Sequence, residues 1–278
     1  MQKKSTILFH IYMGAFLIYL LVPLLVMGGA AFNDSKLPTI IPWKGFTDRW
    51  FIDMWNDNRI WIALRNTLLV ALAVVVIAVP IGTAGAILVN SISGRIRGVL
   101  YGMMVAPILI PGVVIGISTL LFWNQFSVGS GLHLSVLGQV SYIASFVMLL
   151  VLARLQSFDQ ALEEAALDLG ATHGQVMRRI LLPHLYPALG AGAAIAFFQS
   201  MENFNVTLFT RGGADTLTVY VFSKVRSGIT PTINALALLL ILFTLGFAIV
   251  YEVNRRRKAR IEAAREAEGR RAEDAELA

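Results

Sequence analysis

The chain has 278 residues, of which 56% are hydrophobic and 14% are charged, and its formal net charge at pH 7 is +6. This composition excludes an ordinary soluble domain and indicates an integral membrane protein. The basic residues gather at the ends of apolar stretches and in a C-terminal tail, without an aromatic and basic face, so a nucleic-acid partner is not expected. The chain contains no cysteine, which excludes disulfides and thiolate metal sites.

About six stretches are apolar enough to cross a bilayer, since a spanning helix needs roughly 20 apolar residues. The sequence therefore predicts an all-α polytopic membrane protein. Its first stretch is predicted to be a span rather than a cleavable signal, because the apolar run of about 25 residues exceeds the roughly 7 to 15 of a signal peptide. The six predicted spans cover approximately residues 7–32, 61–90, 99–123, 134–154, 185–207 and 232–253.

Lysines and arginines gather on one side of the predicted spans, and the positive-inside rule makes that side cytoplasmic. We expect residues 1–6 to form a cytoplasmic N-terminus, residues 7–253 a transmembrane domain, and residues 254–278 a cytoplasmic tail. The tail is alanine-rich with mixed charge, which is typical of a solvated helix. It contains a Glu262-Ala263-Ala264 triplet, but no Ile-x-Leu-Pro follows, so no function is assigned to it.

Two prolines lie four residues apart in the predicted third span. Pro107 and Pro111 each remove a backbone hydrogen bond, so the pair predicts a bend or gate on a substrate pathway, with Trp123 closing it from outside. The alternative is a packing kink beside an ordinary interfacial aromatic belt.

A polar loop at about residues 155–183 separates the fourth and fifth predicted spans. Ser157 with Gln160, and Thr172 with Gln175, have the spacing of capping boxes. The loop is therefore predicted to contain two short helices.

Gly170 is predicted to end the first of these helices in a left-handed conformation, and the second helix is expected to be interrupted before Pro183. Small side chains would let a partner approach the first helix closely, beside an acidic edge. These residues are Ala165 and Ala166, with Glu164 and Asp168 at i, i+4 spacing. The alternative is a solvated hairpin with good caps.

The predicted fifth span carries polar residues near its end. Gln199, Glu202 and Asn203 have the i, i+3, i+4 spacing of one helix face, and an ionisable residue in a span usually faces a cavity or a partner. This stripe is predicted to line a substrate pathway and to attract an amine through Glu202. The alternative is an interhelical hydrogen-bond cluster that holds a permease pair together.

The polar loop fills every position of a longer signature: Glu164-Ala165-Ala166, then Gly170 after three residues, then Ile180-Leu181-Leu182-Pro183 after nine more. This pattern resembles the signature of binding-protein-dependent ABC importer permeases. The resemblance implies the type I ABC importer permease fold, with this loop as the coupling helix that rests in a cleft of an ATPase. The ATPase-coupling residues would then be Glu164, Ala165, Ala166, Asp168, Gly170, Ile180 and Pro183.

The energy source is expected outside this chain, because the sequence contains no G-x-x-x-x-G-K-[ST] phosphate loop. The chain is thus not expected to be an enzyme or to hold a cofactor, and ATP and Mg are expected on a partner ATPase. The resemblance implies a pair of ATPase subunits, a second permease subunit and an extracytoplasmic substrate-binding protein. It also implies a place among the lipids of a bacterial inner membrane, with both termini cytoplasmic.

Further segments resemble the spermidine/putrescine (PotC-like) type of these permeases: residues 31–35, 43–46, 63–68, 219–220 and 229–237. A polyamine or related amine is therefore the first expectation for the substrate. Polyamine permeases tend to carry acidic residues where this chain has Gly112 and Asn203. A monoamine, an amino-acid derivative or an aminophosphonate is the alternative.

Other classes have less support in the sequence. An ion-coupled secondary transporter could use Glu202 as a proton site, but the chain has no inverted halves and carries a complete docking signature. The four histidines are scattered, without the spacing of a metal site or a catalytic constellation.

Overall fold

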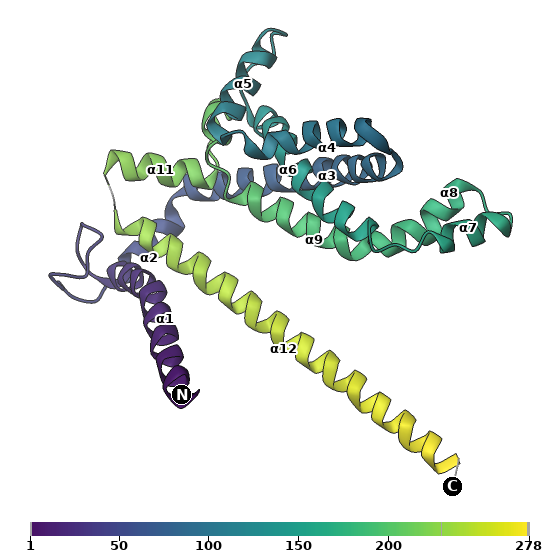
Figure 1. Cartoon of the computed structure of the whole chain (residues 1–278). Helices are drawn as coiled ribbons and strands as arrows, with labels where there is room; N and C mark the ends of the chain where they lie inside the picture. Colours follow the sequence, from purple (N-terminus) through teal and green to yellow (C-terminus); the bar gives the residue numbers. More distant parts are fainter. Residues whose placement is uncertain (1, 229, 277–278) are drawn as a thin grey trace. The chain divides into compact units, whose positions relative to one another are not determined.

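The computed structural model is almost entirely helical and describes residues 2–228 and 230–276 (Figure 1). Residues 1, 229, 277 and 278, which include the outermost residues of the predicted cytoplasmic N-terminus and tail, lie outside the described part. The helices are α1 Gln2–Phe32, α2 Arg49–Asn56, α3 Asn58–Ser91, α4 Gly94–Leu109, α5 Gly112–Asn124, α6 Leu132–Leu155, α7 Ala161–Asp168, α8 His173–Val176, α9 Leu182–Met201, α10 Thr207–Thr210, α11 Leu217–Ser227 and α12 Pro231–Glu276, with a π-helical segment at Met177–Leu181.

Five helices of the described part are long and apolar enough to cross a membrane, and the bent pair α4 and α5 makes a sixth span if it is counted as one. Each predicted stretch corresponds to one of these spans. The third is broken, because α4 and α5 meet at 104°. The fifth was misplaced, since its helical region runs over His173–Met201 and ends before Thr207. The predicted all-α membrane fold is confirmed.

The chain divides into two compact units, a terminal unit of Met1–Asp57 with Lys224–Ala278 and a central unit of Asn58–Ser223. The core of the central unit lies between α3, α6 and α9, where Val74, Val147 and Leu185 are fully buried. The backbones of α3 and α6 touch at Gly82, where an added Cβ would lie 2.5 Å from the Ala144 carbonyl oxygen. Small residues permit such close packing of membrane helices.

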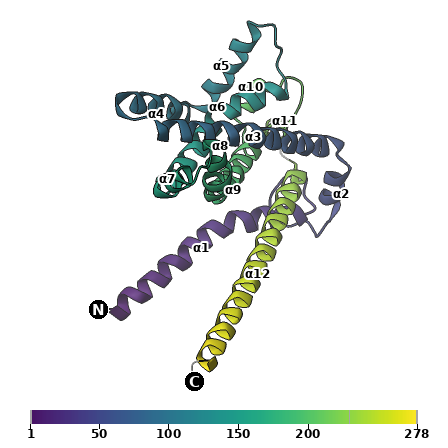
Figure 2. The ribbon, with the colours of Figure 1, turned by 90° about the vertical axis from the view of Figure 1, so that its right-hand side faces the viewer.

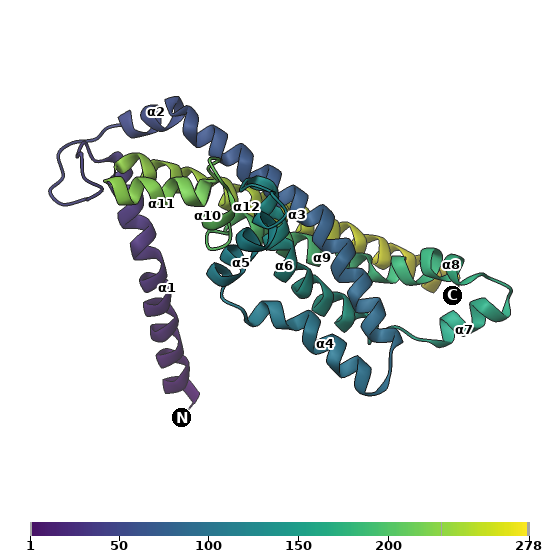
Figure 3. The same ribbon diagram turned by 90° about the horizontal axis from the view of Figure 1, so that it is seen from above.

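Within the central unit, α4 runs alongside α6 (Figure 3), and α5 leaves the direction of α4 at the bend while still contacting α6. Pro111 is the N-cap of α5, and the Ile110 N–H donates to the Pro107 carbonyl oxygen at 3.3 Å. The bend predicted from the two prolines is therefore present, and it divides the third span into two helices.

In the terminal unit, α1 and α12 meet near the end of α1 and the beginning of α12 and then diverge (Figure 2). Ala31 and Ala235 are buried where they meet. Asn33, also buried, organises the following loop: its amide donates to the carbonyl oxygens of Thr39 and Pro42 at 2.7 and 3.1 Å, and its side-chain oxygen accepts from the Lys44 N–H at 2.8 Å.

Candidate functional site

The coupling-loop candidate lies in the central unit, between the end of α6 and the beginning of α9. Arg154 and His184 close its base, since the Arg154 Nε donates to the His184 carbonyl oxygen at 3.1 Å and the His184 ring Nε2 lies 3.3 Å from the Arg154 carbonyl oxygen. The ring of Phe158 packs edge-on against His184, with centroids 5.2 Å apart. The end of α6 and the beginning of α9 are therefore held together where the loop leaves the apolar core.

Gly170 ends α7 in the predicted manner. Its φ is +84°, in the left-handed region that favours glycine, and the Ala171 N–H donates to the Ala166 carbonyl oxygen at 3.0 Å. This arrangement pairs an otherwise free carbonyl at the helix end and turns the chain sharply toward α8.

Only one of the two predicted capping boxes forms. Thr172 and Gln175 make the reciprocal pair that begins α8. The box at Ser157 and Gln160 was a wrong prediction, because the Ser157 hydroxyl donates backward to the Arg154 carbonyl oxygen at 2.8 Å. Asp159 instead accepts from the Ala161 N–H at 3.0 Å, two residues on, as in an Asx turn.

The second loop helix loses its regular α-helical geometry before Pro183, as expected, but the chain stays helical and is not broken there. The helical path continues from His173 through the π-helical segment, which contains Ile180, into α9. Pro183 lies in the first turn of α9. Proline has no N–H to donate to a carbonyl oxygen of the preceding turn, and its ring crowds that turn. The wider turn of the π-helical segment accommodates both effects.

The exposed face of α7 combines apolar and acidic side chains. Leu162 and Leu169 are 54% and 89% exposed, and Ala165 lies between them on the helix. Glu164 and Asp168 are exposed beside this stripe, as the i, i+4 spacing predicts. An apolar stripe with an acidic border on a short, well-capped helix is suited to contact with another protein.

The substrate-pathway candidates gather where α9 ends. The helix stops at Met201 and Glu202 is its C-cap, so Glu202 and Asn203 are not part of a continuous helix face. Together with Gln199 they nevertheless line one open pocket of about 270 Å³. Phe204 and Asn205 from the same polar segment also line it, and so does Tyr142 of α6, which was not predicted from the sequence.

Asn203 and Glu202 have different surroundings. The Asn203 amide donates to the Tyr142 hydroxyl at 2.7 Å, and its side-chain oxygen accepts from the backbone N–H groups of Val206 and Thr207 at 3.2 and 3.3 Å. Glu202 is exposed, and its carboxylate has no hydrogen bond or ion pair within the described part of the chain. Asn203 thus holds the local structure, whereas the Glu202 carboxylate is available in the pocket.

Three α6 side chains at i, i+4, i+7 spacing hold the segment that follows α9. Polar residues at this spacing inside an apolar span were the signal that could have revealed them. The pairs are Ser135 with Thr210 at 2.9 Å, Gln139 donating to Thr207 at 2.9 Å, and Asn203 donating to Tyr142 at 2.7 Å. Gln139 is 1% exposed, and its oxygen also accepts from Ser200 at 2.6 Å.

Glycines of α5 and α6 form a socket for the same segment. Val206 is fully buried, and a Cβ added at Gly116 or Gly138 would lie 3.0 Å from its carbonyl oxygen or 2.7 Å from its Cγ1, respectively. A Cβ added at Gly112 would lie 3.0 Å from the Asn205 Cβ. The bend in the third span therefore brings α5 directly against the wall of the pocket.

The other candidates in the third span do not line this pocket. Pro107 lines a separate cavity of about 170 Å³ between α3, α4 and α6. Pro111 caps α5, and Trp123 packs near the other end of that helix against Phe122 and Phe126, with centroids 5.5 and 6.3 Å away. None of these three candidates is among the described residues that line the Glu202 pocket.

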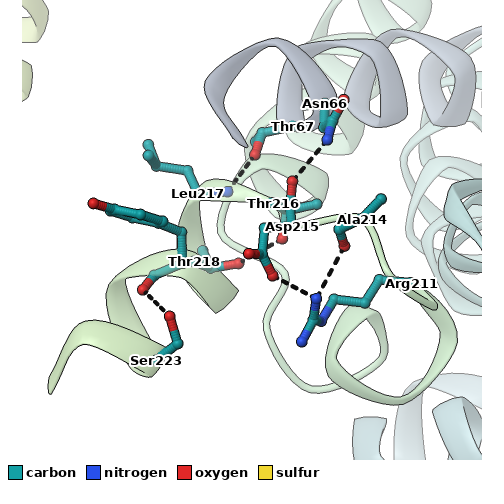
Figure 4. A network of polar contacts seen from close by, with 10 residues as sticks. Asn66, Thr67, Arg211, Ala214, Asp215, Thr216, Leu217, Thr218 and Ser223 are labelled. Atoms are coloured by element: carbon teal, nitrogen blue, oxygen red, sulfur yellow. Dashed lines mark hydrogen bonds and ion pairs between the residues drawn. The ribbon is translucent and has the colours of Figure 1, made fainter. Parts of the chain in front are cut away.

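The loop after α10 is anchored to α3 (Figure 4). The Asn66 amide donates to the Asp215 carbonyl oxygen at 2.9 Å, and the Leu217 N–H donates to the Thr67 hydroxyl at 2.8 Å. The side chains of Arg211 and Asp215 form an ion pair within the loop. These bonds fix the polypeptide that continues from the pocket segment into α11.

Comparison with known proteins identifies the class. Over 91% of this chain and 95% of the other, the structure matches a bacterial ABC transporter involved in the import of the acidic polysaccharide alginate, with a TM-score of 0.70 and 19% identity. An amino acid ABC transporter crystallised with histidines matches with a TM-score of 0.54 and 23% identity, over 75% of this chain and 98% of that one. The fold is that of an ABC importer permease.

The amino-acid sequence is also similar to that of known permease subunits. Residues 78–260 match the family of binding-protein-dependent transport system inner membrane components. The chain is 34% identical over 254 residues to the putrescine transport system permease protein PotI of Escherichia coli K12, covering 87% of this chain and 89% of that protein. It is 29% identical over 250 residues to the spermidine/putrescine permease protein PotC of the same strain, covering 90% and 94%.

The chain belongs to the family of inner-membrane components of binding-protein-dependent transport systems. It is a multi-pass permease subunit of an importer that works with a substrate-binding protein. This membership decides against an ion-coupled secondary transporter, the other class that the sequence left open.

Proposed function

We propose that this permease imports a polyamine, or a closely related amine, and that the Glu202 carboxylate meets an ammonium group of the substrate in transit. The observation that carries the proposal is the pocket, which brings one carboxylate together with the amides of Gln199 and Asn205 and the Tyr142 hydroxyl. Carboxylate and amide oxygens accept hydrogen bonds from an ammonium group. The relatives that transport putrescine and spermidine support the same class of substrate.

The energy for transport comes, in this proposal, from a pair of ATPase subunits that bind ATP and Mg, and a second permease subunit completes the pathway. The exposed Leu162, Ala165 and Leu169 stripe of α7, with the acidic Glu164 and Asp168 beside it, forms the surface that contacts the ATPase. Ile180 and Pro183 belong to the helical segment that continues from this loop into α9. Movement of α7 would pass through the turn at Gly170 into this helical segment, whose other end carries Glu202.

Uptake by the reconstituted importer tests the proposed function. In proteoliposomes that contain the permease pair, the ATPase and the binding protein, we expect ATP-dependent accumulation of labelled putrescine or spermidine. Neutral and anionic solutes of similar size serve as controls, together with an aminophosphonate. Uptake of the aminophosphonate without uptake of either polyamine would contradict the assignment of substrate.

Topology gives a separate prediction, because the chain has no cysteine of its own and a single introduced cysteine reports one position. We expect cysteines at Gly174 and after Arg260 to be protected from a membrane-impermeant thiol reagent in intact cells. Cysteines at Trp43 and Gly131 should react with it. The physical reason is the excess of Lys and Arg on the Gly174 side. Equal labelling at Gly174 and Trp43 would contradict the proposed orientation.

A further inference from the structure

A second pocket lies in the central unit, between the end of α3, the beginning of α4 and the end of α6. Its volume is about 470 Å³, and it shares no lining residue with the Glu202 pocket. Along α4 its wall is formed by Gly94, Arg97, Gly98 and Tyr101, which follow the i, i+3, i+4, i+7 spacing of one helix face. Figure 3 shows α4 lying alongside α6 in this part of the molecule.

The opposite wall follows the same spacing along α6, with Leu149, Leu152, Ala153 and Gln156. Gln156 is the C-cap of α6, and Arg97 lies in the first turn of α4, so the polar groups are at the helix ends. The apolar residues lie further into the spans. The pocket therefore has a polar end, at Arg97 and Gln156, next to a largely apolar wall, and it lies between helices that are candidate membrane spans.

Two glycines line the α4 side of this space. A Cβ added at Gly94 or at Gly98 would meet no atom within 4 Å. On the facing helix, Leu152 is only 6% exposed, so the apolar wall is firmly packed from behind. There is thus open space at both glycines, and the α6 wall of the pocket is apolar and closely packed on its far side.

The pocket also carries a positive charge, on Arg97, that no acidic side chain of the same helices neutralises. Arg97 is half-buried, and its guanidinium has no carboxylate partner among the residues whose side chains the structure describes. No aspartate or glutamate occurs anywhere between Asn58 and Phe158, which covers all three helices that form the pocket. A guanidinium in a partly apolar setting without an acidic neighbour favours an anion, and its planar fork suits phosphate in particular.

We propose that this pocket binds an anionic phospholipid, with the headgroup phosphate at Arg97 and Gln156 and an acyl chain along Leu149 and Leu152. A lipid fits better than free phosphate or a nucleotide, because most of the wall is apolar and the pocket opens beside membrane spans. Basic pockets between transmembrane helices are known to accommodate anionic headgroups. The bound lipid would join α4 to α6 next to the bend in the third span.

Two pairs of variants test this site in the assembled importer. Gly98→Leu fills the pocket, whereas Gly102→Leu adds the same side chain one turn further along α4, where a Cβ also meets nothing within 4 Å and no pocket residue is replaced. Arg97→Gln removes the charge, and Arg95→Gln removes a neighbouring charge outside the pocket. The importer is purified from nanodiscs that contain phosphatidylglycerol and phosphatidylcholine, and the retained lipid is counted by native mass spectrometry.

We expect the wild type, Gly102→Leu and Arg95→Gln to retain phosphatidylglycerol in preference to phosphatidylcholine. Gly98→Leu and Arg97→Gln should each retain roughly tenfold less, as expected for the loss of one charge-assisted hydrogen bond or of the space itself. Equal retention by all five proteins, or no preference for phosphatidylglycerol in the wild type, would overturn the proposal. Thermal stabilisation of the wild type by inorganic phosphate but not by phosphatidylglycerol would also overturn it, in favour of a soluble anion.

Discussion

Glu202→Gln will reduce uptake of a cationic substrate by roughly ten- to a hundredfold in apparent affinity, which corresponds to one charged hydrogen bond of about 1.5 to 3 kcal/mol. The amide keeps the shape of the side chain, removes its charge and replaces one acceptor oxygen by a donor NH2 group. Because the Glu202 carboxylate has no hydrogen bond within the described residues, its loss leaves the hydrogen-bond network around Asn203 intact. Assembly of the complex and its basal ATPase activity should therefore stay near the wild-type level. Uptake kinetics across substrate concentrations provide the measurement.

Two variants separate this prediction from a structural role. Glu163→Gln removes a carboxylate from α7, away from the pocket, and should leave uptake unchanged. Asn203→Ala breaks the bonds to Tyr142 and to the backbone of Thr207, so it should lower the yield of assembled complex. If Glu202→Gln behaves like Asn203→Ala, or if it transports like the wild type, the carboxylate is not a substrate contact.

Gly170→Val will uncouple the importer from its ATPase. Gly170 has a φ of +84°, and a left-handed conformation costs an ordinary residue about 1 to 2 kcal/mol and a β-branched residue more. The turn after α7 must then change, and the exposed face of α7 will no longer present its residues in the same direction. Stimulation of ATPase activity by the loaded binding protein should fall severalfold or more, while the spans remain inserted.

Gly174→Val is the matched control, because Gly174 is exposed in the same loop but has no positive φ and lies in α8. It should retain stimulated ATPase activity. A reversal of charge at the acidic edge, Glu164→Arg, should reproduce the loss without changing the turn, whereas Glu163→Arg on a less exposed position should have a smaller effect. Normal stimulation of ATPase activity in both Gly170→Val and Glu164→Arg would show that this loop is not the docking site for the ATPase.

Local sequence patterns were sufficient to predict the membrane spans, the bend in the third span and the turn after α7. The apolar stretches predicted the spans because a bilayer requires about 20 apolar residues for each crossing. Two prolines predicted the bend that separates α4 from α5, and Gly170 predicted the left-handed end of α7. Each of these features depends on residues that are close in the chain, so each could be predicted without knowledge of the fold.

Features that depend on competition between nearby partners were less predictable. Ser157 has the spacing of a cap, yet its hydroxyl donates to Arg154, and Asp159 supplies the cap-like bond instead. The fifth span appeared to continue to Thr207 because its residues are mostly apolar. It ends at Met201, and side chains of α6 bond to the segment that follows.

Only the tertiary structure decided which residues share a site. Tyr142 and Glu202 are far apart in the chain and line one pocket, whereas Pro107 and Trp123 are not among the residues that line it. The sequence also showed Arg97 as one more positive charge beside a span. Its pocket is formed by one face of α4 and an apolar stripe on α6, more than fifty residues away along the chain. Side-chain periodicity fixes which residues share a helix face, but the pairing of two faces depends on how the helices pack.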